Sequence, residues 1–169
     1  MKLLLLTLLF FPSLSFATGQ TGERFIYKGD EVEMFGFPLE VYFKENPPRP
    51  AWLTEMNTAC YRGYVGTWEL IGEELYLKSV TRSEWTDAST DPVKREIFGR
   101  LFPKATTPLK ADWFSGTLTV PRGKVLRVEG FTEVREKEER LTFEQGRLIE
   151  SRTLNNRPKP RPHSKGKTP

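Results

Sequence analysis

Two carboxylates of the chain lie among aromatic residues, a setting in which acidic side chains can give and accept protons. Glu69 follows Trp68 in the stretch CYRGYVGTWEL, residues 60–70, and Asp112 precedes Trp113 in KADWFSGTL, residues 110–118. Glycoside hydrolysis needs two carboxyl groups at a set separation, so Glu69 and Asp112 are the pair to test for such chemistry. Acids in these surroundings more often neutralise an arginine, and the sequence favours a non-enzymatic protein over an enzyme.

Arg62 is the second residue of chemical interest, because it falls in an apolar stretch. If residues 60–70 form a strand, Arg62 shares a face with Cys60, Tyr64 and Trp68. A buried guanidinium is costly unless it stacks on a ring or meets a carboxylate. We expect it to pair with Asp112, with Glu69 or with another acid that the fold brings close. The alternative is a cation that faces an anionic or sugar ligand.

The two dense stretches can adjoin in one sheet, which would gather their polar and aromatic side chains into a cluster. Trp68, Trp113 and Tyr64 would then be stacking platforms for a sugar, with the two acids nearby. The predicted ligand- or partner-binding residues are Arg62, Tyr64, Trp68, Glu69, Asp112 and Trp113.

Several common chemistries have little support in the sequence. The only histidine, His163, lies near the C-terminus in a segment without apolar residues, and the only cysteine is Cys60. A nucleophile–histidine site needs its histidine held beside the nucleophile by folded structure, and a zinc site needs more cysteine and histidine ligands than these two residues supply. The chain also lacks a GxGxxG phosphate-binding motif. We therefore predict no metal and no cofactor, and we expect Cys60 to be a buried thiol.

The two ends of the chain differ from its body. Residues 1–17 carry Lys2, an apolar run from Leu3 to Phe11, and small residues at Ser15 and Ala17, the pattern of a signal peptide cleaved after Ala17. We therefore expect export, to the periplasm or beyond the cell. The formal net charge of +4 becomes −2 once Lys2 and five C-terminal cations are set aside: Arg157, Lys159, Arg161, Lys165 and Lys167. The basic character belongs to the tail and does not predict specific nucleic-acid binding.

Residues 155–169 are predicted to be a disordered, proline-rich tail, and residues 18–154 a single β-rich domain. The tail is either a solubilising end, a docking segment for a proline-recognising partner, or an attachment to an anionic surface.

The body reads mainly as strands joined by glycine-containing turns. Four hairpins are predicted, with turns at Gly29–Asp30, at Gly72, at residues 121–123 and at Gln145–Gly146. Residues 110–118 should be a strand, and the charged run 133–140 a solvated turn. Helices are expected from Pro38 to before Pro47 and from Asp91 to Phe102. The predicted class is α+β with predominantly antiparallel strands, arranged as a meander sheet or small open barrel under one or two covering helices.

The sequence resembles a group of small uncharacterised bacterial proteins over residues 27–150. The segments that carry the resemblance are ACYRGYVGTWEL, LYL, LFP and ADWFSGTL. The resemblance implies a bacterial origin and no activity. With the signal, it leads us to expect a binding protein of the bacterial envelope whose partner is a protein or a glycan. A carbohydrate-binding module, a weak glycan hydrolase and tail-mediated attachment remain the alternatives.

Overall fold

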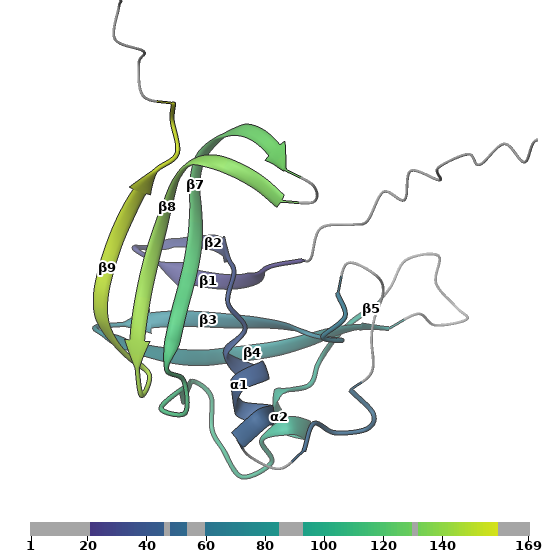
Figure 1. Cartoon of the computed structure of the whole chain (residues 1–169). Helices are drawn as coiled ribbons and strands as arrows, with labels where there is room; N and C mark the ends of the chain where they lie inside the picture. Colours follow the sequence, from purple (N-terminus) through teal and green to yellow (C-terminus); the bar gives the residue numbers. More distant parts are fainter. Residues whose placement is uncertain (1–20, 46–47, 54–59, 85–92, 130–131, 159–169) are drawn as a thin grey trace, which may run out of the picture.

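The computed structural model describes residues 21–45, 48–53, 60–84, 93–129 and 132–158. The predicted signal peptide and the tail from Lys159 onward lie outside these residues, as do Arg161, Lys165 and Lys167. The described residues form nine strands and two helices in one open, mostly antiparallel sheet (Figure 1). The predicted α+β class is confirmed, and the sheet is not closed into a barrel.

The sheet follows the order β2-β1-β3-β4-β9-β8-β7, with β5 and β6 each paired to β4. The strands are β1 (Glu23–Tyr27), β2 (Asp30–Met34), β3 (Val65–Ile71), β4 (Glu74–Glu84), β5 (Val93–Glu96), β6 (Leu109–Lys110), β7 (Gly116–Glu129), β8 (Thr132–Glu144) and β9 (Arg147–Asn155). Among these pairs only β1 and β3 run parallel.

The sheet bends so that β1–β4 cross behind β7–β9 (Figure 1). Where the two ends of the sheet approach, Phe35 and Thr119 exchange backbone hydrogen bonds of 2.8 and 2.7 Å. Trp68 and Phe25 from one half and Leu118 and Phe143 from the other belong to one core. Helix α1 (Pro38–Glu45) adds Leu39 to that core. The core therefore lies inside the bend.

Three of the four predicted hairpins are confirmed, at the turns that join β1 to β2, β3 to β4 and β8 to β9. The fourth is wrong. Residues 121–123 lie inside the long strand β7, which continues to Glu129. Gly123 has a φ of +79° and sits at a shift in register between β7 and β8. A proline and a glycine here mark an irregular edge strand rather than a turn.

The predicted solvated turn at 133–140 is also wrong, because these residues are part of β8. Their mixed charges suit a strand whose side chains form ion pairs along an exposed ribbon. The predicted strand at 110–118 is interrupted: Asp112 and Trp113 form a turn between β6 and β7.

The first predicted helix is confirmed as α1, but the second is largely wrong. Asp91 and Pro92 lie outside the described residues, Val93–Glu96 is strand β5, and helix α2 covers only Phe98–Leu101. The Glu96 carboxylate accepts hydrogen bonds from the backbone N–H groups of Val80 (3.0 Å) and Phe98 (2.8 Å). Pairing with β4 thus overrides the helical spacing of the apolar residues.

Candidate functional site

Arg62 lies in a buried ion pair with Glu23, the first residue of β1. Its Nε is 3.4 Å from Oε1 of Glu23, and the two side chains are 6% and 0% exposed. The expectation that Arg62 pairs with a carboxylate is confirmed, but the partner is neither Asp112 nor Glu69. Strand β3 begins only at Val65, so Arg62 sits in a turn before the strand rather than within it.

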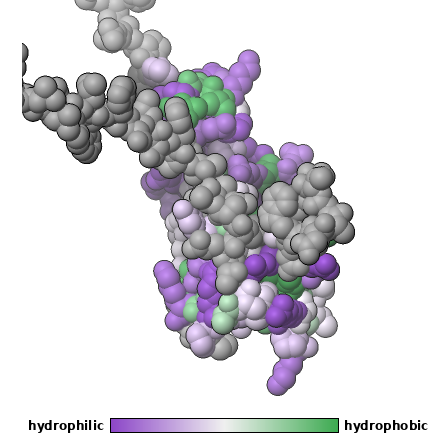
Figure 2. Space-filling model, turned by 90° about the vertical axis from the view of Figure 1, so that its right-hand side faces the viewer, coloured by the Kyte–Doolittle hydropathy of each residue, from purple (hydrophilic) through white to green (hydrophobic). Residues whose placement is uncertain are grey.

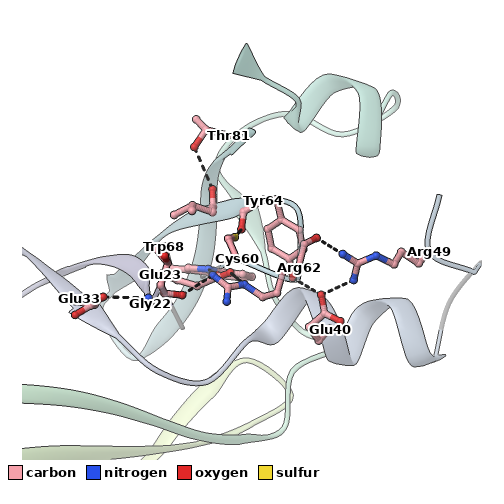
Figure 3. Close-up of polar contacts among 12 residues, drawn as sticks. Gly22, Glu23, Glu33, Glu40, Arg49, Cys60, Arg62, Tyr64, Trp68 and Thr81 are labelled. Carbon is pink, nitrogen blue, oxygen red and sulfur yellow. Dashed lines mark hydrogen bonds and ion pairs between the residues drawn. The ribbon is translucent and has the colours of Figure 1, made fainter. Parts of the chain in front are cut away.

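The other oxygen of Glu23 accepts a hydrogen bond from the indole N–H of Trp68 (Figure 3). Gly66 makes room for this contact. A Cβ at residue 66 would lie 2.6 Å from Oε2 of Glu23 and 2.6 Å from Nε1 of Trp68. At Gly66 the backbone is therefore approached closely by a carboxylate from the neighbouring parallel strand.

A second acid extends the network to α1. Glu40, in the first turn of α1, accepts hydrogen bonds from the Tyr64 hydroxyl (2.9 Å) and from Nη1 of Arg49 (2.7 Å). Arg49 also donates to the backbone oxygen of Arg62 (Figure 3). We call Glu23, Arg62, Trp68, Tyr64, Glu40 and Arg49 the polar cluster. It ties α1 and the turn before β3 to the sheet.

The Arg62 guanidinium has further contacts besides Glu23. Its Nη2 donates to the backbone oxygen of Thr21 at 2.8 Å, and its Cζ lies 4.0 Å from the centre of the Phe37 ring. A ring face stabilises a cation within about 6 Å. Arg62 is thus held by a carboxylate, a carbonyl and a ring, the structural role that the sequence favoured.

Burial governs the electrostatics of the cluster. It raises the pKa of Glu23 from 4.5 to about 7, against the opposing effects of the Arg62 charge and the Trp68 hydrogen bond. Burial likewise raises the pKa of Tyr64, with the negative charge of Glu23 as the next cause. A carboxyl group with a pKa near neutral is suited to proton transfer. Glu23, however, is 1% exposed. Its carboxyl group therefore holds structural elements together inside the protein and does not contact a substrate.

The remaining predicted site residues lie elsewhere. Glu69 pairs with Lys78 at 3.0 Å, and Asp112 is exposed in the turn before β7. Trp113 is half-buried and donates its indole N–H to the Pro38 backbone oxygen at 3.1 Å. The structure thus brings Arg62, Tyr64 and Trp68 together but leaves Glu69, Asp112 and Trp113 outside.

The buried rings bear on the sugar-stacking alternative. Trp68 and Tyr64 are both fully buried, and a stacking platform must present a ring face to its ligand. In this conformation neither ring is open to a sugar.

Cys60 is also buried, as predicted, and its Sγ donates to the Tyr64 backbone oxygen at 3.2 Å.

A polar groove of about 450 Å³ lies beside the start of β1. Its walls carry Glu31 and Glu33 from β2, Arg24 from β1 and Lys94 from β5. Glu33 accepts a hydrogen bond from the Gly22 backbone at 3.0 Å, and Arg24 lies 3.8 Å from Glu31. The charges that line the groove are thus partly engaged with one another.

A group of exposed apolar side chains lies on the β7–β8 ribbon. Strand β9 ends at Asn155, opposite Lys137. We call residues 122–129 and 132–137 the arm, because beyond Lys137 only β7 and β8 pair with each other. Val125, Leu126 and Val128 are 42%, 37% and 64% exposed on it, and we call these three the arm tip. Figure 2 shows a hydrophobic patch framed by hydrophilic residues at this end of the molecule.

The beginning of the C-terminal tail braces the base of the arm. The side-chain amide of Asn156 donates to the Arg135 backbone oxygen (3.0 Å) and to the Glu138 carboxylate (3.1 Å). Arg157 donates to the Glu136 carboxylate at 2.8 Å. Sequence reasoning missed the arm, because residues 121–123 were interpreted as a turn. The apolar triplet in KVLRV, next to Glu129, was the available signal.

Comparison with known proteins gives no relatives: no family model, no curated protein and no solved structure matches the chain. Neither helix of the described residues is long and apolar enough to cross a membrane. Those same residues contain no group of three or more histidine, cysteine, aspartate or glutamate side chains that could hold a metal ion.

Proposed function

We propose that this chain is an exported binding protein of the bacterial envelope that docks its arm tip into an apolar pocket of a partner protein. The observation that carries the proposal is the exposure of Val125, Leu126 and Val128 on a projecting two-stranded ribbon. The signal-like N-terminus supports export.

A two-stranded ribbon that no other layer covers has nothing against which to bury apolar side chains. Such ribbons are at best marginally stable alone in water. Apolar residues at the arm tip therefore contribute little to the folded core. Contiguous exposed apolar groups with a polar rim are typical of interaction sites. The arm tip has that composition.

The charges around the arm tip favour a protein partner. Arg127 pairs with Glu129 at 2.6 Å, and Arg135 pairs with Glu133 at 2.7 Å. Because these cations are already matched by neighbouring acids, the tip offers an apolar surface framed by nearly balanced charge. Apolar cores inside polar rims are characteristic of protein–protein interfaces.

The test compares the mature chain with a Val125→Ser/Val128→Ser variant and with an Ile71→Ser control. Ile71 is 46% exposed at the end of β3, so the control removes a comparable apolar group outside the arm. Each form is used to capture partners from envelope extract, and the affinity of the purified partner for each form is then measured. We expect the arm variant to lose the partner and the control to retain it. Equal affinity of all three forms for the partner would contradict the proposal.

Attachment to an anionic surface is a second candidate, favoured by the position of Arg157. Its ion pair with Glu136 fixes the beginning of the basic tail at the base of the arm. Lys159, Arg161, Lys165 and Lys167 follow in the sequence. Binding to vesicles that contain phosphatidylglycerol, lost with added salt and with deletion of residues 159–169, would support this candidate. Salt-independent binding, or binding that survives the deletion, would contradict it.

A further inference from the structure

Strand β9 has an outer edge that is mostly unpaired. Among the described residues it pairs with β4 only at Glu74 and Arg147. The Leu148 N–H donates to the oxygen of Glu73, in the turn before β4, at 2.7 Å. From Ile149 to Asn155 no strand among the described residues pairs with this edge, which faces outward in Figure 1. An unpaired edge presents backbone donors and acceptors to any strand that can lie beside it.

The two terminal strands of the sheet, β7 and β2, are protected in ways that the open edge of β9 is not. Strand β7 contains Pro121 and two shifts in register, and both features obstruct the addition of a strand. Strand β2 is only five residues long and carries three acids. The open part of β9 contains no proline, and its one irregularity, opposite Thr142 and Phe143, lies at the beginning of that part. Its edge is therefore the best template for pairing in the described sheet.

The charges of β9 fit a second copy of the same strand. In an antiparallel pair related by a two-fold axis, residues at equal distances from the axis lie opposite each other. With the axis at Ser151, Glu150 of each chain faces Arg152 of the other. An axis at Glu150 or at Arg152 would instead place like charges opposite each other. Only the register centred on Ser151 makes both charged pairs attractive.

Both charged side chains lie where a second chain can reach them. The side chains of Glu150 and Arg152 are 53% and 68% exposed, and their mutual contact of 2.9 Å lies on the surface of the strand. Within the chain, Arg152 stands opposite Arg140 of β8, and like charges placed opposite each other are unfavourable. A glutamate from a second copy would offset this repulsion.

We propose that two copies of this chain associate edge to edge through β9, in an antiparallel ladder centred on Ser151. The ladder covers Ile149–Thr153 of each chain, because the Glu73 backbone occupies the edge next to Leu148. Five residues from each chain make a short interface, so the dimer forms in a concentration-dependent way. The interface lies on β9 and not at the arm tip, so it does not depend on the proposed partner docking.

The test uses charge reversal and sedimentation velocity on the mature chain over a wide concentration series. The wild type should show a reversible monomer–dimer equilibrium. Glu150→Arg alone and Arg152→Glu alone should each weaken the dimer roughly tenfold or more, because each replaces two attractive pairs by two repulsive ones. Circular dichroism should show that both variants fold, since both sites are exposed.

Mixing the two single variants is the decisive step. In a mixed dimer, the new arginine of one chain faces the new glutamate of the other, and the native Arg152 of the first faces the native Glu150 of the second. The mixture should therefore form a one-to-one dimer under conditions where each variant alone is monomeric. A wild type that stays monomeric, or a mixture that does not restore the dimer, would overturn the proposal. Monomeric wild type that binds an added peptide strand would assign the edge to a different partner and would also overturn it.

Discussion

Glu23 and Arg62 form an ion pair from which solvent is nearly excluded, with 3.4 Å between Oε1 and Nε. The pair joins the first strand of the sheet to the turn that precedes β3, and hydrogen bonds through Tyr64 and Arg49 extend it to α1. A buried pair of this kind costs desolvation energy that its attraction need not recover. Its consequence is that these three elements are fixed relative to one another.

The stability of the fold should fall as pH rises from about 4.5 to about 7. Burial raises the folded-state pKa of Glu23 to about 7, above its ordinary value of 4.5, so the folded state holds this proton more tightly than the unfolded state does. Raising the pH through this window favours unfolding by roughly 3 kcal/mol in total, and the effect levels off above it. Urea denaturation at several pH values measures the change. Glu23→Gln should flatten this part of the profile, and an unchanged slope would refute the assignment to Glu23.

Removing Glu23 should destabilise the protein more than removing Arg62. Glu23→Ala leaves the Arg62 guanidinium buried without its carboxylate, and arginine cannot lose its charge. We expect a loss of about 3–5 kcal/mol in the free energy of unfolding. Arg62→Ala should cost less, because the remaining Glu23 carboxyl can take up a proton.

The control for this comparison is Arg24→Ala. Arg24 and Glu31 form an exposed pair at 3.8 Å, and such pairs contribute about 0–1 kcal/mol. Denaturation curves of the three variants at one pH give the ranking. Equal losses of unfolding free energy for Glu23→Ala and Arg24→Ala would show that the buried pair contributes no more to stability than an exposed pair.

Gly66→Ala should destabilise the protein by about 1–3 kcal/mol. Its new methyl group would overlap Oε2 of Glu23 and Nε1 of Trp68, both 2.6 Å away, and overpacking of a filled core has costs of this size. Gly99→Ala is the matched control, because nothing lies within 4 Å of a Cβ at residue 99. Thermal denaturation of both variants distinguishes a specific clash from a general effect of replacing glycine, which would lower both melting temperatures alike.

The beginning of the tail should hold the arm in place. Asn156→Ala removes the hydrogen bonds to the Arg135 backbone oxygen and to Glu138. We expect faster amide hydrogen exchange in residues 122–129 and 132–137, with little change in the core strands. Thr117→Ala, in β7 outside the arm, serves as the control. Unchanged exchange in the arm of the Asn156 variant would mean that β7 and β8 hold it alone.

Local sequence signals predicted the features that depend on neighbours in the chain. The turns at Gly29, Gly72 and Gly146 follow from glycine beside polar residues between apolar runs, and each of these glycines has a positive φ. Helix α1 follows from Pro38 at its start and apolar residues at helical spacing. The burial of Cys60 followed from its lone position in an apolar stretch.

Features that depend on distant residues were not predictable in the same way. The Arg62 side chain showed that an acid was needed, but no local pattern in the sequence marks Glu23 as that acid. It reaches Arg62 only because β1 pairs in parallel with β3, and sequence does not give strand order. Similarly, Val93, Ile97 and Leu101 have helical spacing, yet hydrogen bonds to β4 draw Val93–Glu96 into the sheet.

Site-specific photo-crosslinking in living cells tests the central proposal most directly. A photoreactive amino acid replaces Val128 at the arm tip in one strain and Ile71, also exposed, in a control strain. We predict one discrete crosslinked protein of the envelope from residue 128 and none from residue 71. The same product from both positions, or no protein product from residue 128, would contradict the proposal that the arm tip is the docking surface.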